Sequence, residues 1–169
     1  MAMRRSACLR TRGAFTIAEA VISMIIVSVM LTAALRVAVY SVTAQARAAD
    51  RQTGRLLVQS LVDEAMAKPY EDPDGSPVFG LETEAAAVRS GYDDFDDYNG
   101  LVESPPKNAD GTAIAGLTGW TRTAVVEWVR LSDPMQTTGS ESGAKRITVT
   151  ATHNGAKVAS LVAVRTRAP

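Results

Sequence analysis

The sequence predicts an α+β protein in which one long N-terminal helix packs on a small antiparallel sheet. A helical pattern without proline runs from Phe15 to Ala67, and the C-terminal third alternates apolar and polar residues as strands do. A turn-rich, acidic stretch separates the two. The 169 residues leave room for one modest globular domain beside the helix.

The first half of this helix has the composition of a membrane span. Residues 15–35 carry a single charge, Glu19, and as a helix they would extend about 30 Å, the thickness of a bilayer core. Residues 1–14 hold four arginines and no acid. This charge bias predicts a single-pass protein with its N-terminus in the cytoplasm and the rest of the chain outside. The span is longer than the apolar core of a secretory signal peptide.

Residues 36–67 continue the helix in amphipathic form. Leu57, Leu61, Val62 and Ala65 recur at helical spacing, so this half is expected to pack on the globular domain. Pro69 ends the pattern, because proline cannot continue a helix. Within this segment, Gly54 is expected to be a soft point, where the helix is easily bent.

Residues 68–118 are predicted to form an acidic, irregular region. From Asp63 to Asp110 there are 13 acidic residues against 3 basic ones, a net charge of −10. Several prolines and Asp-Gly and Asn-Gly pairs mark turns. A short helix is expected over residues 81–89.

The densest group of oxygen ligands in this region lies between Tyr92 and Gly100. Two interpretations stay open: a Ca²⁺ site, because clustered carboxylates suit that ion, or a solvated acidic loop held by its aromatic residues. The spacing differs from that of an EF-hand loop. The candidate ligands are Asp93, Asp94, Asp96, Asp97 and Asn99, and the aromatic anchors are Tyr92, Phe95 and Tyr98.

Residues 119–169 are predicted to form the antiparallel sheet. Residues 120–131 read as one strand, with Trp120, Ala124, Val126 and Trp128 on one face and Arg122 and Arg130 interspersed. Residues 145–153 and 158–164 form a hairpin around Asn154-Gly155, a pair typical of a type I′ turn. Residues 134–143 are expected to be a flexible loop.

The sequence offers little for catalysis, and we expect no enzymatic activity. Its single cysteine, Cys8, and single histidine, His153, exclude disulfide frameworks and Cys/His zinc sites. His153 abuts the predicted turn, and no nucleophile, phosphate-binding or metalloprotease motif is present. Equal numbers of basic and acidic residues give no direct signal for nucleic-acid binding. Apart from possible Ca²⁺, no cofactor is expected.

The start of the chain resembles the prepilin signal of type IV pilins and type II secretion pseudopilins. After the basic leader come Gly13, Ala14, Phe15, Thr16 and, in register, Glu19. The resemblance implies that a prepilin peptidase cuts between Ala14 and Phe15 and methylates the new amine of Phe15. Glu19 is then the fifth mature residue. The chain departs from the family where Ala14 replaces the usual glycine before the cut.

The resemblance implies a pilin-like fold and a structural role in a filament. Glu19, with Thr16 beside it, would neutralise the amine of a neighbouring subunit during assembly. The implied partners are the prepilin peptidase, other pilins or pseudopilins, and an inner-membrane assembly platform with its ATPase. The protein would sit in the inner membrane, with its C-terminal domain periplasmic or extracellular, before it enters the filament.

A second resemblance is confined to the acidic region. The run from Tyr92 to Gly100, followed by Glu103-Ser104-Pro105-Pro106, looks like a segment of some minor pilins, so a minor subunit is expected. The alternative from another class is a membrane-anchored extracytoplasmic binding domain that never polymerises, with or without dependence on Ca²⁺. In that case Glu19 would be an acid tolerated at the membrane interface.

Overall fold

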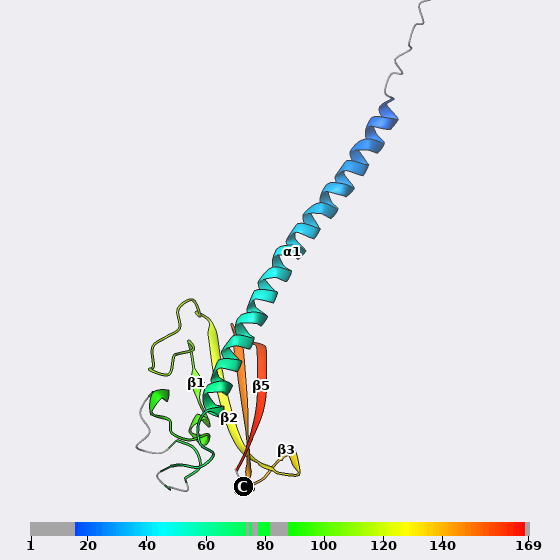
Figure 1. Cartoon of the computed structure of the whole chain (residues 1–169). Helices are drawn as coiled ribbons and strands as arrows, with labels where there is room; N and C mark the ends of the chain where they lie inside the picture. Colours follow the sequence, from blue (N-terminus) through cyan, green and yellow to red (C-terminus); the bar gives the residue numbers. More distant parts are fainter. Residues whose placement is uncertain (1–15, 74, 76–77, 82–87, 168–169) are drawn as a thin grey trace, which may run out of the picture. The chain divides into compact units, whose positions relative to one another are not determined.

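The computed structural model describes residues 16–73, 75, 78–81 and 88–167. It confirms the predicted α+β class, with one long apolar N-terminal helix packed on a small antiparallel sheet. The chain divides into two compact units, residues 1–45 and 46–169, and the boundary falls within the helix. The elements in chain order are α1 (Ile17–Met66), η1 (Arg89–Gly91), η2 (Asp96–Tyr98), β1 (Val102–Glu103), β2 (Trp120–Arg130), β3 (Asp133–Thr137), β4 (Ala144–His153) and β5 (Ala156–Thr166) (Figure 1).

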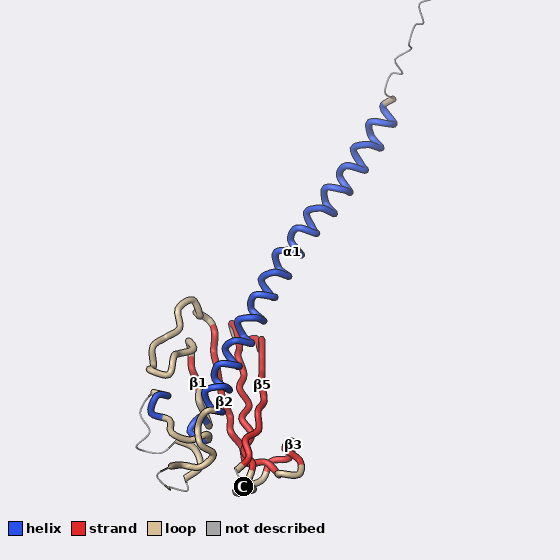
Figure 2. Tube along the Cα trace, in the orientation of Figure 1, coloured by secondary structure: helices blue, strands red, loops and turns tan. Residues whose placement is uncertain are grey.

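The second unit, which we call the head, is built on an antiparallel sheet. Its strands follow the order β1-β2-β4-β5, and β3 pairs with β2 (Figure 2). The predicted hairpin of β4 and β5 is confirmed: Asn154 and Gly155 take φ of 51° and 80°, the positive values that a type I′ turn requires. Gly155 adopts this conformation without the steric cost that a side chain would bring.

Two details of the sheet differ from the sequence-based expectation. Part of the loop expected over residues 134–143 forms β3, which tolerates Pro134 because its only strand neighbour among the described residues is β2. In β2 the register shifts between Val129 and Arg130. Val129, next to this irregularity, is completely buried, whereas the predicted core residue Trp128 is half-buried.

The core of the head lies between the second half of α1 and one face of the sheet. Leu57, Leu61, Val62 and Ala65 are buried, as their helical spacing predicted. They pack with residues of the sheet and of the acidic region that leads to it. The other members of this cluster are Val58, Tyr92, Phe95, Tyr98, Leu117, Trp120, Ala124, Val126, Ile147, Val149 and Ala151.

A buried ionic cluster joins α1 to the sheet. Glu103 of β1 accepts hydrogen bonds from Arg122 of β2 at 2.6 Å and from Arg89 of η1 at 3.1 Å. Arg122 also donates to the Leu57 carbonyl of α1 at 3.3 Å, while Arg89 pairs with Glu64 of α1 at 3.4 Å. Arg122 shares the core face of β2 with the apolar residues, and Glu103 gives its charge a buried partner.

Gly54 is not a soft point, so that expectation is wrong. The helix runs through it without interruption, and the residue is buried against β5. A Cβ atom at this position would lie 2.9 Å from Val158 Cγ1 and 3.2 Å from the Cβ of Ala159. The register of β4 and β5 shifts between Ala151 and Thr152, opposite Val158. Gly54 therefore allows close approach of the helix and the strand.

Replacing Gly54 by valine should lower the free energy of unfolding of the head by about 1–3 kcal/mol, because the added methyl groups overpack the contact with Val158. Gln52→Val is the control, since Gln52 is exposed on the same helix and a surface change is expected to cost at most about 0.5 kcal/mol. Denaturant unfolding of the full chain in non-ionic detergent measures both. Equal effects of the two substitutions would contradict the packing role of Gly54.

Candidate functional site

The N-terminal end of α1 is fixed by its own side chains. The Glu19 backbone N–H donates to Thr16 Oγ1 at 3.3 Å, and the Ala20 N–H donates to the Thr16 carbonyl at 3.2 Å. Thr16 is therefore the N-cap, and Glu19 occupies the third helical position. A carboxylate in the first turn also faces the positive end of the helix dipole. Gly13, Ala14 and Phe15, the predicted processing residues, lie outside the described residues.

The spacing of Thr16 and Glu19 is that of a capping box, a signal that sequence reasoning missed. A threonine followed three residues later by glutamate, just before an apolar run, is typical of a helix start. The predicted role of Thr16 rested on the family resemblance. The pattern itself predicts that α1 begins after Thr16. It also gives Glu19 a local structural role at the helix start.

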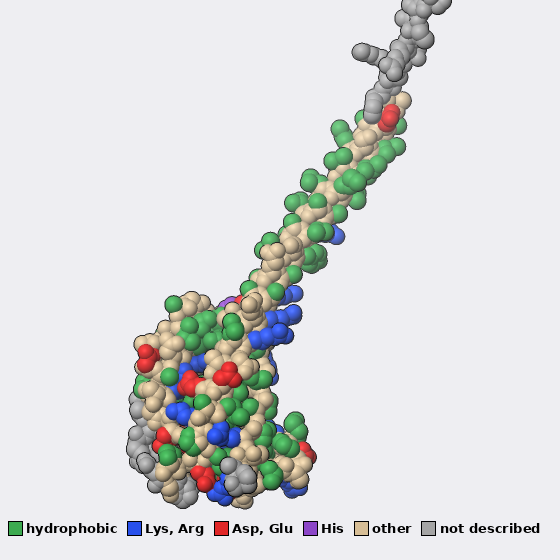
Figure 3. Space-filling view, viewed as in Figure 1, with side chains coloured by type: hydrophobic (Ala, Val, Ile, Leu, Met, Phe, Trp, Pro, Cys, Tyr) green, Lys and Arg blue, Asp and Glu red, His purple; other side chains and the backbone are tan. Residues whose placement is uncertain are grey.

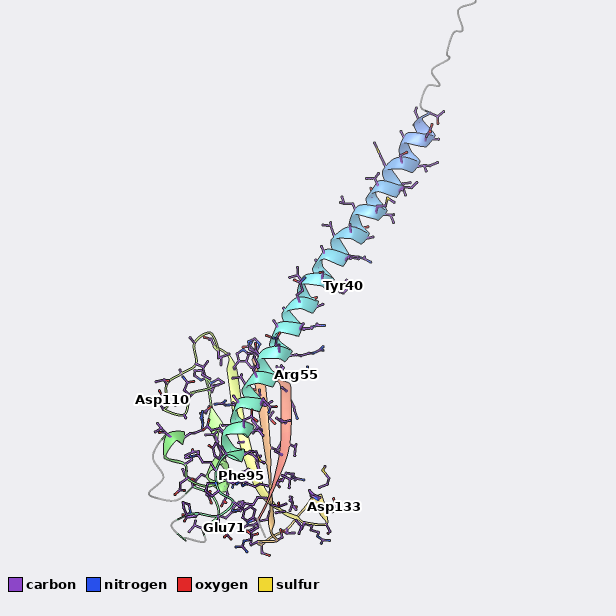
Figure 4. The ribbon with its side chains drawn as sticks, viewed as in Figure 1. Tyr40, Arg55, Glu71, Phe95, Asp110 and Asp133 are labelled. Carbon is purple, nitrogen blue, oxygen red and sulfur yellow. The ribbon has the colours of Figure 1, made fainter. Side chains whose placement is uncertain are left out.

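The first half of α1 presents apolar side chains in all directions. Its large apolar residues between Ile17 and Val42 each expose 50–86% of their surface. Figure 3 shows these side chains following the helix, and Figure 4 labels one of them, Tyr40. Burying such a side chain is worth about 1.5–3 kcal/mol, so this surface is unfavourable in water. An 18-residue window of α1 has a mean hydropathy of 2.2, and the helix is long and apolar enough to cross a membrane.

Four hydroxyl groups of this part of α1, those of Ser23, Ser28, Thr32 and Thr43, bond to the backbone of their own helix. Ser23 donates to the Glu19 carbonyl at 2.8 Å, and Ser28 donates to the Met24 carbonyl at 2.7 Å. Thr32 and Thr43 bond in the same way to carbonyls three and four residues earlier. These donors need no partner from outside the helix, which makes the surface suitable for lipid or for other apolar helices.

The acidic run, by which we mean residues 92–100, is largely buried in the head. Its interpretation as a solvated loop is therefore wrong. Asp94, Asp96 and Asp97 each expose 2% or less of their surface. Asp94 Oδ1 accepts the backbone N–H groups of Asp96 at 2.9 Å and Asp97 at 3.0 Å. Asp97 Oδ2 accepts that of Asp93 at 2.8 Å. The predicted anchors Tyr92, Phe95 and Tyr98 are buried, and Phe95 is labelled in Figure 4.

Two further candidate ligands, Asp96 and Asn99, also bond to other parts of the protein. Asp96 forms an ion pair with Lys145 of β4 and accepts the Gly80 N–H at 2.9 Å. Asn99 Oδ1 accepts the Val126 N–H of β2 at 3.0 Å. These bonds attach the acidic run to the sheet. Sequence reasoning recognised the oxygens but missed their donors, which lie far along the chain.

No group of three or more His, Cys, Asp or Glu side chains in the described part of the chain is arranged to hold a metal ion. Asp94 Oδ1 and Asp97 Oδ2 accept backbone N–H groups and Asp96 pairs with Lys145, while Asp97 Oδ1 is buried with no hydrogen-bond partner among the described residues. These bonds close the loop of residues 92–100 and attach it to the sheet. Ca²⁺ binding stays a prediction.

His153 packs at the hairpin of the sheet. Its ring stacks on Trp120 with centroids 4.6 Å apart, and its Nδ1 lies 3.2 Å from Asp50 Oδ2 of α1. These contacts agree with the prediction, made from its position in the sequence, that His153 is a structural residue at the turn.

Comparison of the chain with family models, with curated proteins and with solved structures gives no match.

Asp94 gives the head a predicted pH dependence. Burial, followed by the neighbouring Asp96 carboxylate, raises the pKa of Asp94 to about 7. Because an unfolded aspartate titrates near 3.9, the unfolded chain loses this proton first as the pH rises. This contribution to stability is complete below about pH 4 and is lost by about pH 7. Asp94→Asn should remove most of the decline, roughly 2–4 kcal/mol, because asparagine does not titrate and its oxygen still accepts N–H groups.

Urea unfolding of the full chain in non-ionic detergent between pH 4 and pH 8 measures this slope. Asp110→Asn is the control: Asp110 is exposed, and hydrogen bonds from the Thr112 side chain and backbone lower its pKa. Its contribution is lost only as the pH falls below about 4, so the control should follow the wild type across this range. The same slope in Asp94→Asn as in the wild type would overturn the assignment to Asp94.

Proposed function

We propose that this chain is a non-enzymatic structural subunit of a type IV pilus or of a type II secretion pseudopilus. The observation that carries the proposal is the first half of α1: a long helix, apolar on all sides, whose first turn holds a glutamate. Such a surface must be covered by lipid before assembly and by neighbouring helices afterwards. The resemblance of residues 13–19 to a prepilin signal gives this helix its proposed use.

The proposed mechanism uses the first turn of α1 to set the register of assembly. Thr16 holds the helix start, and Glu19 is exposed at its third position. After processing, the methylated amine of Phe15 on one subunit would meet the Glu19 carboxylate of the next. In an apolar filament core an unpaired charge is heavily penalised, so subunits would pack where this pair forms.

The head has a different part in the proposed subunit. Its fold is fixed by the buried cluster of Glu103, Arg122 and Arg89, and the second half of α1 belongs to its core. The head would therefore remain folded while the first half of α1 passes from lipid to protein neighbours. The proposed partners are prepilin peptidase, sibling subunits, and an inner-membrane platform with its ATPase, with the head on the periplasmic or extracellular side.

Glu19→Gln and Glu19→Val test this role in the native host. Both variants keep the backbone N–H that donates to Thr16 Oγ1. Glutamine lacks only the charge of Glu19, whereas valine lacks the polar side chain as well. Both variants should still enter the membrane, and both should reduce incorporation into sheared filaments, or cross-linking to sibling subunits, by at least ~tenfold. Immunoblots of the membrane and filament fractions measure the two steps separately.

Asp63→Asn is the matched control, because it neutralises an exposed carboxylate in the second half of α1. It should assemble like the wild type. Normal incorporation of Glu19→Gln would contradict the charge-pairing mechanism. A wild-type chain that stays monomeric in the membrane, with the assembly machinery present, would favour the anchored, non-polymerising domain.

A further inference from the structure

A groove of the head runs between α1 and the edge strand β5. Arg51, Arg55 and Gln59 of α1 form one wall. Val58, Val158 and Leu161 are among the apolar residues that line it, and Ser160 lies on the strand side. The buried ionic cluster joins α1 to β1 and β2, so it occupies the other side of the helix.

The arginines on this wall have no ionic partner among the described residues. Arg47, Arg51 and Arg55 follow one another at intervals of four along α1, and Figure 3 shows Lys and Arg side chains gathered on this part of the helix. Arg55 is labelled on α1 in Figure 4. Like charges at this spacing repel one another, and all three arginines are exposed. The groove therefore presents positive charge that a carboxylate would neutralise.

The strand side of the groove offers unpaired backbone groups. Within the described residues β5 has β4 as its only neighbouring strand. The Arg167 N–H donates to the Gly143 carbonyl at 3.0 Å, which fixes the alternation of the ladder. The N–H and C=O groups of Ser160, Val162 and Val164 therefore point away from β4.

The middle of β5 lacks the usual protection of an exposed edge. Residues 158–164 carry no charge and no proline, and Val162 exposes half of its surface. Natural proteins protect or cover such an edge, because it otherwise pairs with other chains. The charged residues Lys157 and Arg165 stand only at its two ends.

We propose that this groove binds an extended acidic polypeptide segment of a partner, added to the sheet as a strand beside β5. The segment's backbone would pair with Ser160, Val162 and Val164, and carboxylates on alternate residues would meet Arg51 and Arg55. This inference goes beyond the proposed function, since it concerns the head and holds whether or not the chain polymerises. An anionic lipid headgroup would satisfy the arginines alone, whereas a strand satisfies both the charge and the open backbone.

The probe is a labelled eight-residue peptide that alternates glutamate with valine or threonine, and the control peptide carries lysine in place of glutamate. Fluorescence anisotropy with the full chain in non-ionic detergent micelles gives the affinity. Hydrogen exchange reports the amides of β5. The acidic peptide should bind saturably and slow exchange at Ser160, Val162 and Val164, and the lysine peptide should bind at least ~tenfold more weakly.

Two changes to the protein test the two halves of the site. The double change Arg51→Glu and Arg55→Glu lies on the exposed helix surface and should weaken binding at least ~tenfold, whereas Arg47→Glu, outside the groove lining, should change it by less than ~threefold. Val162→Pro removes an outward N–H without breaking the β4 ladder and should also weaken binding at least ~tenfold, with Val162→Ala as its control.

Absence of saturable binding would overturn the proposal. So would binding that neither the double arginine variant nor Val162→Pro reduces, because the peptide would then lie elsewhere. If the arginines instead govern binding to phosphatidylglycerol vesicles while the peptide fails to bind, the surface is a lipid contact and the proposed strand site is wrong.

Discussion

The apolar surface of the first half of α1 is the constraint on which the rest of this protein depends. Large side chains from Ile17 to Val42 are exposed on a helix in which Ser23 and Ser28 already donate to its own backbone. Contact with lipid or with other helices lowers the free energy of such a helix, whereas contact with water does not. Glu19 is the one acid in this half, and Thr16 holds the turn on which it lies. In the proposed filament, the amine of a neighbouring subunit would pair with this charge.

The buried polar side chains of the head largely bond to one another, although Asp97 Oδ1, Trp128 Nε1 and Arg146 Nε have no hydrogen-bond partner among the described residues. Glu103 and the two arginines bonded to it lie between the helix and the sheet, where each charge has a counter-charge within hydrogen-bonding distance. The acidic run follows the same principle, since its carboxylates accept backbone N–H groups or pair with Lys145. Buried charge in the head thus specifies how loop, strand and helix fit together, while unpaired positive charge remains on the β5 side of α1.

The sequence was sufficient for the features that depend on local pattern. Helical spacing identified Leu57 and Leu61 as core residues, and Asn154-Gly155 identified the hairpin. It was insufficient where a distant residue decides the outcome. Arg122 is buried because Glu103 meets it across the sheet, and Gly54 is needed because Val158 lies against it. The acidic run looks solvated in sequence because its partner Lys145 lies 49 residues beyond Asp96. The spacing of Thr16 and Glu19 was sufficient to predict the helix cap, but the prediction relied on the family resemblance instead.

We propose that α1 is the processed assembly helix of a filament subunit, and the intact mass of the protein extracted from membranes of its native host tests this proposal most directly. We expect a chain that begins at Phe15 and carries one added methyl group, so that Glu19 stands one turn from the new amine. A chain that retains Met1, or one that begins beyond residue 35 and lacks the apolar helix, would contradict it.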